Sequence, residues 1–103
     1  MNRYIKNGKV AVLYSPGYGA GWTTWNEEYP EMLFSPEIAE ALDNKADYQT
    51  LEEISERLFP GAFLGGLEQL KIEWVEPGSQ IRIDEYDGNE SVYILNDVQW
   101  PIA

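Results

Sequence analysis

The sequence contains no cysteine and no histidine. Without a thiol or an imidazole, the chain has no Ser-His-Asp or Cys-His catalytic centre and no standard zinc site. The lack of cysteine also excludes disulfide bonds and is typical of proteins in a reducing compartment. We therefore predict a non-catalytic protein with no metal and no cofactor. The enzymatic alternative that stays open is a hydrolase that uses carboxylates and Mg²⁺.

Basic residues are also scarce. Seven Lys and Arg stand against 18 Asp and Glu, which gives a formal net charge of −11. Duplex nucleic acid is bound through many cationic contacts to phosphate, so this charge argues against it as a partner. No apolar run approaches the roughly 20 residues that span a bilayer, and no signal segment is visible at the start. We predict a soluble, cytoplasmic protein that does not engage a membrane.

The length and the apolar content are those of a folded domain. The chain has 103 residues, of which 44% are hydrophobic and 14% aromatic. Such a composition argues against disorder in spite of the charge, and the length suits one core. We expect residues 1–103 to form a single domain.

Strand patterns occupy both ends of the chain. Asn7-Gly8 is typical of a type I′ hairpin turn, and the apolar run at 10–14 after it predicts a central strand covered on both faces. Near the other end, alternating residues separated by Pro77-Gly78 and Asp87-Gly88 predict an antiparallel meander. Trp100-Pro101 is expected on an edge of the sheet, because proline cannot donate to a ladder.

Two helices are expected between the strands. Ser35 and Pro36 are typical of an N-cap and a first helical position, and this helix should end near residues 43–44. Thr50 and Glu53 have the spacing of a capping box for a second helix. The predicted fold class is therefore α+β, with an antiparallel sheet of about five strands, formed by an N-terminal hairpin plus a C-terminal meander, and two short helices between.

A glycine-spaced loop rich in aromatic residues follows the apolar strand directly. Gly17, Gly19 and Gly21 can adopt positive φ, so that consecutive amide N–H groups turn toward one point and form a cradle for an anion. The aromatic rings beside them offer flat faces for stacking on a planar group. The loop residues predicted to bind a ligand are Ser15, Gly17, Tyr18, Gly19, Ala20, Gly21, Trp22, Thr23, Thr24 and Trp25.

The charge around this loop differs from that of the rest of the chain. Residues 1–26 contain three basic residues and no acidic one, whereas all acidic residues lie beyond them. We expect Arg3, Lys9 and Arg82 to supply positive charge to an anionic ligand, since salt screens the repulsion from distant carboxylates.

A more ordinary interpretation of the loop is also open. Glycines after a strand commonly form turns, and aromatic residues beside them commonly close the core. The Gly-x-Gly-x-Gly spacing matches neither the dinucleotide fingerprint nor the P-loop. Thr24 and Glu27 have the spacing of a capping box, which predicts a helical turn after the glycines.

Three segments resemble a group of small uncharacterised proteins from phages and prophages. They are VAVLYSPGYGAGW at 10–22, IEWVEPGSQIRI at 72–83 and EYDG at 85–88. The similarity runs through most of the chain but brings no established activity, so no functional residue is carried over. It implies a non-enzymatic factor in the host cytoplasm that acts on host machinery or host defence.

Two functional hypotheses follow. In the first, the loop captures a small, planar, phosphorylated ligand such as a nucleotide signal of host defence, in a homo-oligomer whose interfaces deepen the pocket. In the second, the protein is an acidic inhibitor that binds a basic host or defence protein, including by mimicry of nucleic acid. The working surface of the second hypothesis is Glu27, Glu28, Glu31, Glu52, Glu53, Glu56, Asp84 and Asp87.

Overall fold

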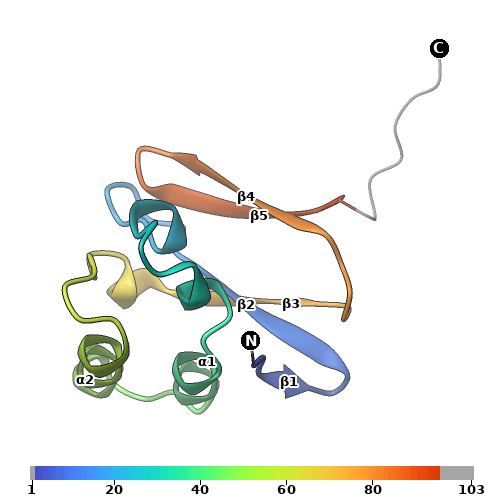
Figure 1. Cartoon of the computed structure of the whole chain (residues 1–103), viewed down its shortest axis with the longest axis horizontal. Coiled ribbons are helices and arrows are strands. Elements are labelled where there is room, and N and C mark those ends of the chain that lie inside the picture. The colour runs from blue at the N-terminus through green and yellow to red at the C-terminus, as the bar shows by residue number, and fades with distance from the viewer. Residues whose placement is uncertain (1, 96–103) are drawn as a thin grey trace.

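The computed structural model describes residues 2–95 and confirms the α+β class, with two α-helices and five antiparallel strands (Figure 1). Three short 3₁₀ helices, labelled η, are the other elements within these residues. The predicted edge position of Trp100-Pro101 lies outside the described residues. In chain order the elements are β1 (Ile5–Lys6), β2 (Lys9–Tyr14), η1 (Thr23–Trp25), η2 (Pro30–Leu33), α1 (Pro36–Asp43), α2 (Tyr48–Leu58), η3 (Leu67–Gln69), β3 (Lys71–Val75), β4 (Ile81–Tyr86) and β5 (Asn89–Ile94).

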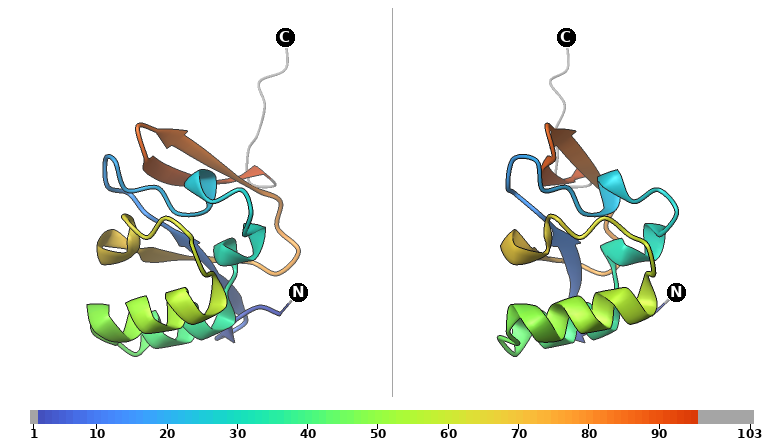
Figure 2. Two further views of the ribbon diagram at one scale, coloured as in Figure 1. Left: turned by 60° about the vertical axis from the view of Figure 1, so that its left-hand side comes forward. Right: turned by 90° about the vertical axis from the view of Figure 1, so that its left-hand side faces the viewer.

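The five strands form two sheets. One has the order β1-β2-β3 and the other is the β4-β5 hairpin. The predicted meander therefore differs from the structure at one step, because β3 pairs with β2 and not with β4; Leu13, for example, lies opposite Ile72. The turn at Pro77-Gly78 carries the chain from one sheet to the other. Figures 1 and 2 show the hairpin on the side of β2 and β3 away from α1 and α2.

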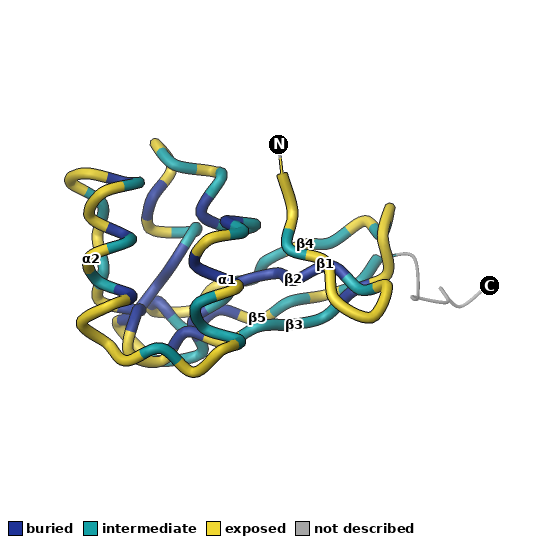
Figure 3. Tube along the Cα trace, turned by 90° about the horizontal axis from the view of Figure 1, so that it is seen from below, coloured by how far each residue is buried: buried dark blue, intermediate teal, exposed yellow. Residues whose placement is uncertain are grey.

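Strand β2 lies at the centre of the fold and is buried on both faces, as its unbroken apolar run predicts. Ala11 and Leu13 contribute to a core shared with the helices. Val10 and Val12 belong to a second cluster, which the inward side chains of the β4-β5 hairpin cover. The alternation of side chains along one strand thus joins the two halves of the core. In Figure 3 the buried β2 contrasts with the exposed outer face of α2.

The helix boundaries confirm one predicted start and correct the other. Ser35 caps α1, and its side-chain oxygen accepts a hydrogen bond from the Ile38 N–H at 3.5 Å. The capping box predicted at Thr50 is wrong, because α2 begins at Tyr48 and Asp47 is its N-cap. Asp47 Oδ1 accepts from the Thr50 N–H at 2.9 Å, and hydrogen bonding to Thr50 lowers the pKa of this carboxyl. No helix within residues 2–95 has the length and apolar character needed to cross a membrane.

Candidate functional site

The glycine loop is pinned to the turn of the β4-β5 hairpin. Gly19 and Gly21 adopt positive φ values of 69° and 49°, as their spacing allowed. Their N–H groups donate to the main-chain carbonyls of Asp87 and Gly88, the latter at 2.7 Å. The backbones approach so closely that a Cβ on Gly88 would lie 2.7 Å from the Ala20 nitrogen. The loop is thus part of the fold and does not stand free of it.

The predicted cradle of glycine N–H groups does not form, because Gly19 and Gly21 donate to the hairpin carbonyls. The N–H groups of Ser15, Trp22 and Thr24 instead bind a carboxylate of the same chain. Glu90 Oε1 accepts from the Ser15 N–H at 2.9 Å. Glu90 Oε2 accepts from the Trp22 N–H at 2.7 Å, the Thr24 N–H at 3.0 Å and the Thr24 hydroxyl at 2.6 Å. Glu90 is only 1% exposed, so these donors compensate the burial of its charge. We call Glu90 with these donors the Glu90 cradle.

The register of the hairpin explains why this glutamate points inward. Two-residue alternation along β5 places Glu90 on the same face as Val92 and Ile94, both of which pack against the β2 side of the core. The sequence analysis did not place Glu90 among the candidate site residues and so missed this role. The signal that identifies it is its place in the apolar alternation, with a polar residue at an inward position.

Trp22 lies in the core, contrary to the stacking face predicted for it. Its side chain is 0% exposed, and its indole Nε1–H donates to the Met32 carbonyl oxygen at 2.9 Å. Since no ring face is open, Trp22 cannot stack on a ligand in this structure. The ordinary interpretation of the loop, in which aromatic residues close the core, therefore holds for this residue.

A helical turn does follow the glycines, as η1, but Thr24 lies inside it and the predicted capping box with Glu27 is wrong. The Thr24 hydroxyl and N–H bind Glu90 instead, and only the short 3₁₀ helix η1 forms here. Of the neighbouring polar residues, Thr23 is half-buried and Ser15 is fully buried. Ser15 is tied to Glu90 twice, because its carbonyl also accepts from the Glu90 N–H at 2.8 Å.

The remaining loop residues are divided between the interior and the surface. Ala20 is 3% exposed, whereas Tyr18 is 71% exposed and meets Tyr86 edge-on at 6.5 Å between ring centroids. A Cβ on Gly17 would lie 1.5 Å from the side-chain oxygen of Gln69, an exposed side chain that can move aside.

The three predicted cationic residues do not converge on the cradle. Arg3 lies over the Phe34 ring at 3.7 Å. Lys9 begins β2, at the opposite end of the strand from the loop, and pairs with Glu76 at 2.6 Å. Arg82 pairs with Asp84 at 2.7 Å. These three side chains therefore do not supply the expected positive charge to the loop.

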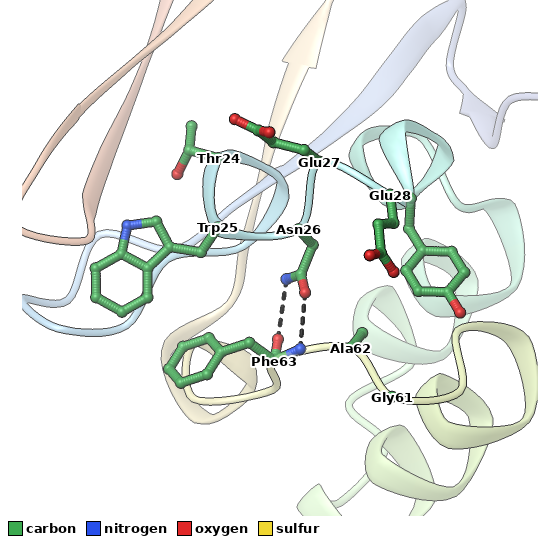
Figure 4. A pocket seen from close by; sticks show the side chains of 9 residues that line it. Thr24, Trp25, Asn26, Glu27, Glu28, Gly61, Ala62 and Phe63 are labelled. Carbon is green, nitrogen blue, oxygen red and sulfur yellow. Dashed lines mark hydrogen bonds between the residues drawn. The ribbon is translucent and has the colours of Figure 1, made fainter.

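A hollow opens beside the loop, where Trp25 and Phe63 form an exposed pair of rings (Figure 4). Trp25 is 40% exposed and Phe63 is 42% exposed, with 5.1 Å between the ring centroids. The hollow has a volume of about 450 Å³. We call it the loop hollow; it is lined by Thr24, Trp25, Asn26, Glu27, Glu28, Tyr29, Gly61, Ala62 and Phe63.

Asn26 holds the two sides of the loop hollow together. Its amide Nδ2 donates to the Phe63 carbonyl at 3.0 Å and to the Trp22 carbonyl at 2.7 Å. Its Oδ1 accepts from the Phe63 N–H at 2.7 Å. Because Asn26 is buried, these bonds fix the segments that carry Trp25 and Phe63 relative to each other.

Carboxylates elsewhere in the described part of the chain form no cluster suited to a metal ion. Among residues 2–95, no three acidic side chains lie close enough together to hold a metal ion. At the turn of the β4-β5 hairpin, Glu90 lies inside the fold and Glu85 accepts a hydrogen bond from the Gly88 N–H at 2.7 Å. The described residues therefore include no group of three acidic side chains that could hold the Mg²⁺ of the hydrolase alternative.

The fold and the loop hollow define a small α+β protein with an aromatic and acidic surface site. No family model, no curated protein and no solved structure matches the chain.

Proposed function

We propose that the protein is a non-catalytic interaction module that binds a basic protein partner through exposed carboxylates. The observation that carries this proposal is the distribution of ion pairs. Lys6, Lys9, Arg57 and Arg82 are each paired with a carboxylate, and Arg3 covers an aromatic ring.

Much of the acidic surface is left without neutralisation. Glu27 and Glu28 at the loop hollow, and Glu53 and Glu56 on α2, are exposed and form no ion pair within residues 2–95. Such a surface attracts a basic partner over the Debye length and steers its approach. On the strength of the resemblance to phage proteins, we propose a host or defence protein as the class of partner, with action in the host cytoplasm.

The small-ligand hypothesis keeps one supporting observation, the exposed ring of Trp25. Its phosphate-binding part is weakened, because the cradle donors are bound to Glu90 and because Glu27 and Glu28 border the hollow. Titration with mono-, di- and cyclic nucleotides, followed by tryptophan fluorescence in the wild type and Trp25→Phe, tests it. The same samples, analysed by light scattering, test the predicted homo-oligomer.

The interaction proposal is tested with the immobilised protein as bait in a bacterial lysate, eluted by a salt gradient. Two variants, Glu27→Lys/Glu28→Lys and Glu53→Lys/Glu56→Lys, change the net charge equally on different surfaces. We expect a basic protein to be retained by the wild type and to elute at lower salt from one variant. Retention of no basic protein, or equal retention by all three baits, contradicts the proposal.

A further inference from the structure

We propose that the loop hollow is the binding site for a single arginine side chain presented by the basic partner. This inference rests on the proposed function and adds to it an anchor residue in the partner. The hollow is one defined place on the acidic surface, where aromatic rings, carboxylates and a fixed backbone occur together (Figure 4).

The aromatic side of the hollow suits a planar cation. Trp25 and Phe63 are inclined to each other by 49°, and both present part of their rings to solvent. A guanidinium group stacks on such faces through the negative charge of the ring quadrupole, and tryptophan is the best ring for this contact. An anionic phosphate would gain nothing from the same faces.

The polar side of the hollow has the complementary charge. Glu27 and Glu28 are both exposed and both line it, and none of its nine lining residues is basic. In Figure 4, Glu28 lies across the hollow from the two rings, with Asn26 between them. A guanidinium seated on the rings therefore has carboxylates within the same hollow with which to form charge-assisted hydrogen bonds.

The site is built before any ligand arrives. The indole of Trp25 packs against the loop, since a Cβ on Gly21 would lie 2.4 Å from its Cγ. Asn26 joins the Trp25 turn to the Phe63 segment through bonds to both. A preformed site loses little conformational entropy on binding, and a volume of about 450 Å³ lies within the usual range for sites that accept small groups.

The chemistry favours arginine over lysine. Lysine carries a compact, strongly hydrated charge, whereas the guanidinium is planar, weakly hydrated and able to stack and to bind a carboxylate at the same time. The hollow offers both kinds of contact. We therefore expect the order arginine, then lysine, then the uncharged isostere citrulline.

The experiment uses three peptide probes of the form acetyl-Gly-X-Gly-amide, with arginine, lysine or citrulline at X. The readout is the indole N–H resonance of Trp25 in ¹H–¹⁵N NMR spectra, assigned with Trp25→Phe. We expect a saturable shift with the arginine probe, and binding of the citrulline probe weaker by about two- to fivefold, the factor for loss of one exposed cation–π contact. The buried indole of Trp22 should not respond.

Two double variants that each remove two negative charges distinguish specific binding in the loop hollow from non-specific electrostatic attraction. Glu27→Gln/Glu28→Gln should weaken arginine binding severalfold, whereas Glu53→Gln/Glu56→Gln on α2 should leave it nearly unchanged. Phe63→Ala should also weaken it, and well-dispersed spectra would show that each variant is folded. Equal binding of the arginine and citrulline probes, or equal losses in the two double variants, overturns the inference.

The lysate experiment distinguishes this inference from the proposed function. If a basic partner is retained by the wild type and equally by Trp25→Ala, the interaction function stands and the arginine anchor is wrong. If the arginine probe binds but no basic protein is retained, the site stands and the proposed function is wrong.

Discussion

Trp22 and Trp25 are three residues apart, yet they belong to different parts of the molecule. Trp22 is fully buried and hydrogen-bonded through its indole, and its N–H also binds Glu90. Trp25 is 40% exposed and forms one wall of the loop hollow. A single turn of 3₁₀ helix therefore separates a core residue from one that lines the exposed loop hollow. The difference teaches that aromatic residues close together in one loop can belong to the core or to the surface, residue by residue.

The largest expected effect comes from removing the two indoles separately. Trp22→Ala should destabilise the fold by about 3–5 kcal/mol, because it leaves a large cavity in the core. Trp25→Ala should cost roughly 1 kcal/mol or less, since its ring is partly exposed. Denaturant unfolding followed by circular dichroism measures both. Similar losses in the two variants would remove the distinction drawn between these residues.

The Glu90 cradle should account for the next largest effect. Glu90→Ala leaves three buried or half-buried N–H groups without their acceptor, and we expect a loss of about 3 kcal/mol. Glu85 lies directly opposite Glu90 in the hairpin but is exposed and accepts only the Gly88 N–H, so Glu85→Ala is a control that removes one acceptor, with an expected loss of about 1 kcal/mol. The urea concentration at the midpoint of unfolding, measured at neutral pH, compares the stability of the two variants. Equal midpoints would contradict the role assigned to the Glu90 cradle.

Gly65 and Gly66 offer a finer test of the difference between the buried loop and the exposed surface beside it. A Cβ on Gly66 would lie 2.5 Å from the Gly21 carbonyl oxygen, which is backbone of the loop. A Cβ on Gly65 would meet only the exposed ring of Phe63, which can rotate away. Gly66→Ala should therefore destabilise by roughly 1–3 kcal/mol, and Gly65→Ala by less than about 1 kcal/mol. Thermal unfolding measures the stability of the two variants. A larger loss for Gly65→Ala than for Gly66→Ala would show that the loop backbone adjusts more easily than the Phe63 ring.

The smallest expected effect lies away from both regions, where Asp43 at the end of α1 joins the first strand. Asp43 Oδ2 accepts from Lys6 Nζ at 2.8 Å and from the Tyr4 hydroxyl at 3.0 Å. The bond to Lys6, followed by that to Tyr4, lowers the pKa of Asp43, and Asp43 in turn raises the pKa of both partners.

A lowered pKa stabilises the fold above the unfolded-state value of about 4, and this contribution is lost as the pH falls through the folded-state pKa. Asp43→Asn should therefore lower stability slightly at pH 7 and leave it nearly unchanged at pH 2. Urea midpoints at the two pH values measure this, with Glu40→Gln on the same helix as the control. An equal loss at both pH values would contradict the proposed charge interaction.

The parts of the fold that could be predicted are those that local sequence specifies. Asn7 and Asp87 do adopt positive φ in their turns, because each precedes a glycine in a type I′ pattern. The burial of β2 followed from its apolar run. The start of α2 was misplaced because Thr50 and Glu53 have capping spacing inside a helix that Asp47 already caps. Local patterns also cannot tell which strand pairs with β3, which is a long-range choice.

The candidate site could be predicted only in outline. The glycine spacing predicted a cradle of glycine N–H groups, whereas the observed donors are Ser15, Trp22 and Thr24. Their acceptor, Glu90, lies more than 60 residues away in sequence and is brought there by the packing of the β4-β5 hairpin against the loop. The exposed partner of Trp25 is Phe63, for which the sequence offered no signal. Side-chain burial in a loop depends on which segments fold over it, so Trp22 and Trp25 were not distinguishable beforehand.

The occupancy of the cradle by Glu90 has a consequence for competition with dissolved ions. A tethered group acts at an effective concentration in the millimolar range or above, and here the hairpin also holds it in the binding geometry. Phosphate, acetate or a nucleotide at lower concentration must displace a ligand that never diffuses away. The chain thereby protects its own amide groups from the anions of the surrounding solution.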